Sequence, residues 1–304
     1  MPSPVSPQPA ATVILIRGAA GEPSVYLMRR SLKSRFMAGS FVSPGGKVDR
    51  EDDDAAFWAD SGDLNAMELS ARLMVGGSGD QSLPTRQPPL LAYAVAAIRE
   101  TWEEAGVLLA DVRNGASGSF DRLHARREGP GLDIGWLRSL VENDKGALAY
   151  SRLWPWAHWI APEAFKQRFD TRFFVAFMPA GQTCRPDPRE TPEGRWMTPK
   201  AALDANTAGE IRLSPPTLVT LHTLLAYDTV DALKVDLPRP DWGPALLPKM
   251  VFPPVGPMVI QPWDANYDVP EGSLPEKRSE IERLPVGAAF SRLWNDAGTW
   301  RPLA

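Results

Sequence analysis

Residues 91–107 read LAYAVAAIRETWEEAGV, and this stretch decides the fold. Apolar residues recur in it at helical spacing, which predicts one amphipathic helix ended by Gly106. The apolar stripe consists of Leu91, Val95, Ile98 and Trp102. On average, Glu100, Glu103 and Glu104 fall about opposite this stripe, within little more than one turn of each other. The sequence therefore crowds three carboxylates onto one helix face.

Helix stability does not explain these carboxylates. Like charges at this spacing repel one another, and the last turns of a helix disfavour anions. Two interpretations remain open. One is a solvated acidic face, which charge runs usually form. The other is a site for a divalent cation, because Mg²⁺ takes carboxylate oxygens and keeps positions open for substrate phosphates.

The exact order of residues favours the cation. Residues 99–107, RETWEEAGV, resemble the second half of the Nudix box, G-x5-E-x7-R-E-U-x-E-E-x-G-U, where U is a bulky aliphatic residue. Residues 44–46, PGG, resemble its first half. An insert of about residues 50–88 separates the halves, and a box split in this way resembles the branch of Nudix hydrolases typified by the peroxisomal coenzyme A diphosphatases.

Two positions depart from the family motif. Counted back from Arg99, the first Glu of the box falls on Leu91, and the aliphatic position after Glu100 holds Thr101. Because both halves of the box must meet around one site, we expect the insert to leave and return at one edge, as a long surface excursion. Its acidic start, residues 49–54, is either solvated or an additional metal contact.

The resemblance covers about residues 12–205 and implies the Nudix fold, an α/β/α sandwich around a mixed β-sheet. Residues 11–227 would form the Nudix hydrolase domain, with the insert inside it. Residues 1–10 are expected to be disordered because they are rich in Pro and Ser, and residues 228–304 to be a C-terminal extension packed on the core. The periodicity predicts strands at 12–17, 25–29, 153–160, 172–178 and 195–199, and helices at 64–73, 120–127, 134–143, 200–205 and 213–227.

The same resemblance assigns roles to charged residues. The residues that would hold Mg²⁺ or Mn²⁺ are Glu100, Glu103 and Glu104. Arg99 and Glu103 are counted among the catalytic residues. In this family a loop carboxylate a few residues before a strand Trp often serves as the base. That Trp is Trp196 here, so we choose Glu190 as the base, with Glu193 second.

The segment before the glycines is basic. It resembles the pattern LLTxRSxxLRxHxGxxxFPGG of coenzyme A-cleaving Nudix enzymes, with Met37 in place of the His and Ser43 in place of the Phe. Guanidinium groups bind phosphate oxygens well, and coenzyme A carries a diphosphate and a 3′-phosphate. The residues expected to bind substrate are Arg30, Arg35, Gly45 and Gly46. Arginines on a solvated loop are the alternative.

The resemblance implies Mg²⁺- or Mn²⁺-dependent hydrolysis of coenzyme A or acyl-coenzyme A to 3′,5′-ADP and (acyl-)4′-phosphopantetheine. A Nudix pyrophosphatase acting on NADH, ADP-ribose or another nucleoside diphosphate derivative is the nearest rival. A non-catalytic Nudix module that binds a nucleotide is a rival of a different class. Such modules usually lack one or more box glutamates, whereas all three are present here.

Composition excludes several partners. The formal net charge of −4 and a pI near 5.5 argue against non-specific electrostatic binding of nucleic acid. No segment is apolar over the length needed to span a bilayer, and the N-terminus does not resemble a signal peptide. The lone Cys184 fits a reducing compartment. We therefore expect a cytoplasmic enzyme with a small-molecule substrate, and the sequence leaves a homodimer open.

Two further sets of polar residues have open roles. Asp170 could bind substrate or form a structural ion pair with Arg168 or Arg172. The three histidines lack metal-ligand spacing, so they are expected to be structural or exposed; they are His124, His158 and His222.

Overall fold

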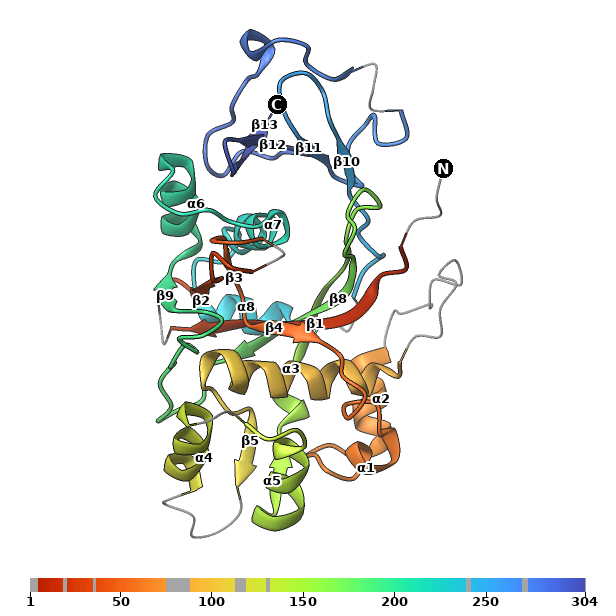
Figure 1. Ribbon diagram of the computed structural model, residues 1–304, viewed down its shortest axis with the longest axis vertical. Helices are drawn as coiled ribbons and strands as arrows, with labels where there is room; N and C mark the ends of the chain where they lie inside the picture. The colour runs from red at the N-terminus through yellow and green to blue at the C-terminus, as the bar shows by residue number, and fades with distance from the viewer. Residues whose placement is uncertain are drawn as a thin grey trace.

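The computed structural model describes residues 5–18, 21–34, 37–74, 88–112, 119–129, 132–238, 242–269 and 273–303. Its centre is a seven-stranded mixed β-sheet. Helix α3 (Leu90–Ala105) covers one face of the sheet, and helices α6 (Pro199–Ala208) and α7 (Pro215–Leu224) cover the other (Figure 1). The predicted α/β/α sandwich is confirmed.

Strand β1 (Gln8–Arg17) runs through the middle of the sheet. It is parallel to β8 (Phe169–Phe177) and antiparallel to β2 (Ser24–Arg29). Strand β7 (Trp154–Ile160) lies beyond β8 and forms one edge. Three short strands complete the sheet: β3 (Phe41–Val42) and β9 (Glu193–Met197) pair with β2, and β4 (Gly45–Lys47) pairs with β1. The two glycines of the split box are thus held directly on the central strand.

The first strand begins earlier than the sequence predicted. Gln8 donates its N–H to the carbonyl of Arg168, and the carbonyl of Pro9 accepts from the N–H of Val48, both at 2.9 Å. The expectation of disorder is therefore wrong for residues 8–10. Pro9 lacks an N–H but still supplies a carbonyl, so it is tolerated at the start of a strand.

Helix α3 ends where its glycine predicted, and it begins directly after a proline. Pro89 is its N-cap, where a missing N–H is harmless because the first turn has no partners for its N–H groups. Gly106 ends it in the left-handed conformation, with φ of 66°, and donates to the carbonyl of Trp102 at 2.9 Å. Thr101, at the aliphatic position of the motif, is fully buried, and its hydroxyl donates to the carbonyl of Ala97 at 2.6 Å.

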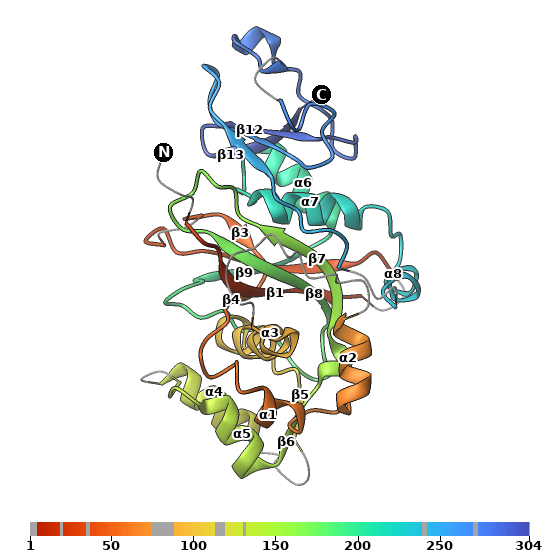
Figure 2. The same cartoon turned by 90° about the vertical axis from the view of Figure 1, so that its right-hand side faces the viewer.

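The insert is part of the core. It forms α1 (Ala55–Ala59) and α2 (Ala66–Met74), which pack beside α3 (Figure 2). Its buried side chains include Trp58, Leu69 and Leu73, which join the same core cluster as α3. The hydroxyl of Tyr150 also donates to the carbonyl of Trp58 at 2.9 Å. The expected surface excursion is therefore wrong for residues 55–74, because these short helices bury their apolar faces on the domain. Residues 75–87 lie outside the described part of the chain.

A small layer beyond α3 supports the helix from below in Figure 1. Its elements are β5 (Ala110–Val112), α4 (Ser119–Glu128), α5 (Trp136–Asp144), β6 (Gly146–Leu148) and the 3₁₀ turn η1 (Tyr150–Arg152). Trp136, Leu137 and Leu140 of α5 are buried against the core. The helices predicted at 120–127 and 134–143 correspond to α4 and α5.

The opposite face of the sheet carries α6, α7 and α8 (Val230–Asp236). Thr198 and Ser214 cap α6 and α7 by accepting N–H bonds, and a proline follows each cap. A second core lies between these helices and the sheet, with members from β1, β2, β7 and β8.

The C-terminal extension contains a four-stranded sheet that the sequence did not reveal. Its strands are β10 (Lys249–Val251), β11 (Met258–Ile260), β12 (Arg292–Asp296) and β13 (Thr299–Leu303), with the 3₁₀ turn η3 (Arg278–Glu280) before β12. Val259, Leu293 and Trp300 belong to the second core. The extension therefore packs on the domain. In the described part of the chain, no helix is long and apolar enough to cross a membrane.

Candidate active site

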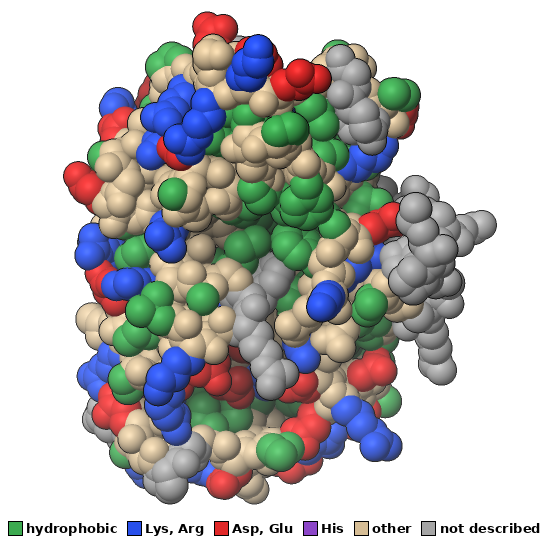
Figure 3. Space-filling model, turned by 45° about the horizontal axis from the view of Figure 1, so that its top comes forward, with side chains coloured by type: hydrophobic (Ala, Val, Ile, Leu, Met, Phe, Trp, Pro, Cys, Tyr) green, Lys and Arg blue, Asp and Glu red, His purple; other side chains and the backbone are tan. Residues whose placement is uncertain are grey.

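A cavity of about 630 Å³ lies on the α7 side of the sheet. One end of its lining is charged and the other is apolar. The charged end includes Arg30, Glu100, Glu104, Arg189 and Glu190, and it also contains Gly45, Gly46 and Lys47. The site residues predicted next to β2, in the split box and in the loop before β9 thus line one cavity. In Figure 3, acidic side chains lie below a group of hydrophobic ones near the centre of one face.

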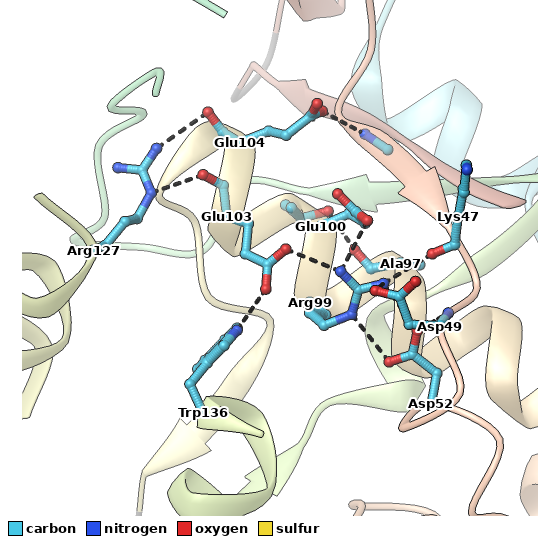
Figure 4. Close-up of polar contacts among 12 residues, drawn as sticks. Lys47, Asp49, Asp52, Ala97, Arg99, Glu100, Glu103, Glu104, Arg127 and Trp136 are labelled. Atoms are coloured by element: carbon cyan, nitrogen blue, oxygen red, sulfur yellow. Dashed lines mark hydrogen bonds and ion pairs between the residues drawn. The ribbon is translucent and has the colours of Figure 1, made fainter. Parts of the chain in front are cut away.

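The two halves of the split box are in direct contact. Oε2 of Glu104 accepts the N–H of Gly45 at 2.8 Å (Figure 4). The carboxylate of Glu100 lies against Gly46, where a Cβ would clash with its oxygens. Glycine is therefore required at 46 so that Glu100 can reach the cavity across β4.

Arg99 joins the acidic residues into one network. Its Nη1 donates to Glu100 and Glu103, each at 2.9 Å, and its Nε and Nη2 donate to Asp52 at 3.1 and 2.9 Å. Asp52 is only 2% exposed. Burial of so many charges is tolerated because each carboxylate has a charged hydrogen-bond donor.

Asp52 corrects one sequence assignment. Counted back from Arg99, the first acidic position of the box fell on Leu91, which is partly buried on the apolar side of α3. Counted forward from Gly46, the same position falls on Asp52, and the structure pairs Asp52 with Arg99. The acidic cluster at 49–54 is therefore not wholly solvated, and its member Asp52 occupies the first acidic position of the box. A count from the glycine end of the motif would have found it.

Glu103 faces a different direction from its neighbours. Its Oε2 accepts from Arg99, and its Oε1 accepts from the indole N–H of Trp136 at 2.6 Å (Figure 4). It is not among the residues that line the cavity. Within the described residues, no three acidic, histidine or cysteine side chains converge as ligands of one ion. Glu103 would reach an ion shared with Glu104 only by leaving Arg99 and Trp136.

The donor set at the cavity fits a hydrated divalent cation. The carboxylates of Glu100 and Glu104 belong to the lining of the cavity. Mg²⁺ is usually held by one or two carboxylates together with substrate phosphates. Burial raises the pKa of both groups, and neighbouring carboxylates add to the rise: Glu104 and Glu103 act on Glu100, and Glu190 and Glu103 act on Glu104. A cation would reverse this by favouring the charged carboxylates.

The end of α3 is fixed by a buried arginine of α4. Arg127 is 4% exposed, and it donates to the carbonyls of Glu103 at 3.0 Å, Glu104 at 3.2 Å and Arg185 at 2.6 Å. These carbonyls at the helix end have no partners within the helix itself. Arg127 thereby connects the end of α3 that carries Glu103 and Glu104 to the loop that carries Glu190. Its spacing from the box gave no sequence signal.

We expect Arg127→Met to lower the free energy of unfolding by about 2–4 kcal/mol, because it leaves buried carbonyls without a charged donor. The measurement is urea denaturation of the purified protein. Arg126→Met is the matched control: Arg126 is the exposed neighbour, and within the described residues it forms an ion pair with Asp133 at 3.2 Å. Equal, small changes in both variants would contradict the anchoring role.

Glu190 and Glu193 lie in different surroundings. Glu190 lines the cavity, and its negative charge contributes to the raised pKa of Glu104. The loop is held to α3 by the N–H of Asp187, which donates to the carbonyl of Glu104 at 3.0 Å. Glu193 instead pairs with Arg29 at 3.6 Å and with Arg195. The geometry favours Glu190 as the base.

Arg30 lies at the charged end of the cavity. Its positive charge lowers the pKa of Glu104. Its buried Nε has no hydrogen-bond partner among the described residues. An unsatisfied buried guanidinium nitrogen beside carboxylates is a suitable donor for a substrate phosphate. Arg35, the second predicted arginine, lies outside the described residues.

Asp170 is not a cavity residue. It is fully buried, and its Oδ1 lies 2.5 Å from Nε2 of His158. The sequence expected an ion pair with Arg168 or Arg172; burial lowers the pKa of Arg172, and the nearby charge of Asp170 partly offsets this lowering. The guanidinium of Arg168 donates instead to the carbonyls of Ala161 and Val5. Of the other two histidines, His222 contacts the carbonyl of Ala288, and His124 packs against the ring of Trp102.

Comparison with known proteins agrees with this geometry. Residues 8–224 match the family model described as the NUDT19 Nudix domain. The acyl-coenzyme A diphosphatase NUDT19 of Gallus gallus is 28% identical over 269 residues, which cover 74% of this chain and 69% of that protein. The protein of the same name from Xenopus laevis is 26% identical, covering 69% of this chain and 61% of the relative.

A solved structure shows the same fold. The NUDIX hydrolase from Alicyclobacillus acidocaldarius superposes with a TM-score of 0.56 at 24% identity, covering 79% of this chain and 99% of that one. The family match extends over more than half of the chain and includes both halves of the split box. The chain therefore belongs to the NUDT19 family of Nudix hydrolases.

Proposed function

We propose that this chain hydrolyses the diphosphate of coenzyme A or acyl-coenzyme A, giving 3′,5′-ADP and (acyl-)4′-phosphopantetheine. The observation that carries the proposal is the meeting of the box carboxylates, Arg30 and Glu190 in one cavity. The names of the chicken and frog relatives, acyl-coenzyme A diphosphatase, support this substrate class.

The residues divide the work as follows. Glu100 and Glu104 hold Mg²⁺ or Mn²⁺, and Arg99 keeps Glu100 in place. When bound, the cation supplies charge neutralisation on the diphosphate and activation of water. Glu190 takes the proton from the attacking water, while Arg30 binds a phosphate oxygen through a charged hydrogen bond. Glu103 fixes Arg99 in this conformation and adds negative charge near the cation site.

Two rivals are tested by a substrate panel. Purified protein is assayed with coenzyme A, acyl-coenzyme A, NADH and ADP-ribose, in Mg²⁺ and in Mn²⁺. Release of 3′,5′-ADP at the highest kcat/KM supports the proposal. Faster cleavage of NADH or ADP-ribose would establish the pyrophosphatase instead. Nucleotide binding without hydrolysis of any substrate would indicate the non-catalytic module.

A reducing compartment such as the cytoplasm suits the chain, since Cys184 is free.

We expect Arg30→Ala to raise KM for coenzyme A and to lower kcat/KM about tenfold to a hundredfold. A lost hydrogen bond to a charged group costs about 1.5–3 kcal/mol, and a contact made equally in ground and transition states acts on KM. The measurement is steady-state kinetics with coenzyme A and with dephospho-coenzyme A. If the lost partner is the 3′-phosphate, the effect will be smaller for the dephospho substrate.

Arg29→Ala is the matched control for this variant. Arg29 is the last residue of β2 and Arg30 follows it directly. Successive side chains of extended backbone point to opposite faces, and Arg29 pairs with Glu193. Near-wild-type kinetics are expected for it. An unchanged KM in Arg30→Ala with both substrates would show that Arg30 does not bind a substrate phosphate.

A further inference from the structure

The cavity continues from the charged end across the sheet. One row of paired residues crosses four strands: Lys47 pairs with Ala10, Ala10 with Thr171, and Thr171 with Trp159. All four residues line the cavity. Three strand spacings of about 4.8 Å place Trp159 roughly 14 Å from Lys47, which directly follows the box glycines.

The far end of the cavity is apolar. Lining residues from β7, β8, α7 and the C-terminal extension include none that is charged, within the part of the chain that the structure describes. The larger ones are Trp159, Phe169, Phe173, Pro215 and Met250, and Phe165 of the loop between β7 and β8 joins them. The charged lining residues come from the loop after β2, from β4 and α3, and from the loop before β9. One continuous cavity therefore has a phosphate end and a hydrocarbon end.

The C-terminal extension closes the hydrocarbon end. Leu246 lies alongside β7: its N–H donates to the carbonyl of His158, and its carbonyl accepts from Ile160, both at 2.8 Å. The chain then enters β10, where Met250 pairs with Val259 of β11. Met250 and Val259 both line the cavity, so one face of this small sheet forms the wall beyond Trp159.

The length of coenzyme A matches this arrangement. The arm between the diphosphate and the sulfur has as many bonds as about four peptide residues, roughly 13–14 Å when extended. A diphosphate at the box and an arm along the sheet would bring the sulfur to Trp159. The next atoms of an acylated substrate are hydrocarbon, and the next surface is Met250 with Val259.

Building on the proposed function, we propose that Met250 and Val259 form the end of an acyl-chain subsite, so that the C-terminal extension selects the length of the acyl group. The occupant is the fatty acyl chain of an acyl-coenzyme A. Each methylene that enters the subsite adds about 0.8 kcal/mol of burial, about fourfold in kcat/KM at most.

The test compares kcat/KM for free coenzyme A, acetyl-coenzyme A and decanoyl-coenzyme A. The wild-type protein is expected to prefer decanoyl over acetyl by about tenfold or more. Met250→Gln keeps the length of the side chain but places an amide in the wall, and it should lower that preference about tenfold. Free coenzyme A should change less than threefold. Met250→Trp should fill the subsite and move the preference to shorter chains.

Val251→Thr is the control, because Val251 belongs to the same strand and packs on its other face. Equal kcat/KM for acetyl and decanoyl substrates in the wild-type protein would overturn the inference. So would an equal loss for all three substrates in Met250→Gln, which would place the adenosine or the pantetheine arm at this wall. If neither free coenzyme A nor either acyl-coenzyme A is cleaved while NADH or ADP-ribose is, the proposed function itself fails.

Discussion

Glu104→Gln is expected to lose about a thousandfold in kcat, which corresponds to about 4 kcal/mol of transition-state stabilisation, while the fold stays intact. The glutamine can still accept the N–H of Gly45 through its carbonyl oxygen, so the bond between the box halves is kept. It loses only the negative charge that would hold the cation. The measurement is the hydrolysis of coenzyme A at saturating substrate and Mg²⁺ or Mn²⁺.

The stability of the same variant separates metal binding from folding. Burial raises the pKa of Glu104, so the folded protein without metal carries this charge at a cost. That cost is absent below the carboxyl's ordinary pKa and grows as pH rises. At neutral pH the metal-free Glu104→Gln protein should therefore be at least as stable as the wild type, with a smaller rise in melting temperature when Mn²⁺ is added.

Glu142→Gln is the control, since Glu142 is an exposed residue of α5 that pairs only weakly with Arg138 at 3.7 Å. Activity within threefold of wild type is expected for it. If Glu104→Gln also keeps its activity within threefold of wild type, α3 does not hold the catalytic metal ion.

The sequence predicted the parts of this site that lie close together in the chain. Residues 99–107 carry a motif with fixed spacing, and its helix is ended by Gly106 as expected. Such a motif is readable because the residues on one helix face are determined by their spacing. The approach of Gly45 and Gly46 to the helix could be expected from the family resemblance, and the structure shows it.

Contacts between distant segments could not be read in this way. Arg127 and Trp136 reach α3 from α4 and α5, and no periodic pattern relates them to the carboxylates they contact. His158 and Asp170 are diagonal neighbours on two antiparallel strands, so their pairing depends on a register that only the folded sheet fixes.

The four-stranded sheet of the C-terminal extension was missed for a different reason. Its strands β10 and β11 are three residues long, and prolines surround them. A run this short shows no alternation that exceeds chance, and proline lowers the expectation of a strand further. Pairing with neighbouring strands and packing against the second core stabilise this sheet, and neither is a local property of the sequence.

Glu190→Gln is expected to lower kcat about a hundredfold to ten-thousandfold, the usual range for removal of a general base. Glu190 lines the cavity beside the carboxylates of α3, and the backbone around it is tied to both sides of the site. Its carbonyl accepts the N–H of Ser31 at 2.9 Å, next to Arg30. KM should change little, because the side chain acts on water rather than on the phosphates.

Glu193→Gln is the decisive comparison, because it changes the same type of side chain three residues further along the chain. Glu193 is held by Arg29 and Arg195, and it does not line the cavity. Its replacement should leave kcat within threefold of wild type. A loss confined to Glu193→Gln would reverse the assignment, since that residue would then have to leave its arginines when substrate binds.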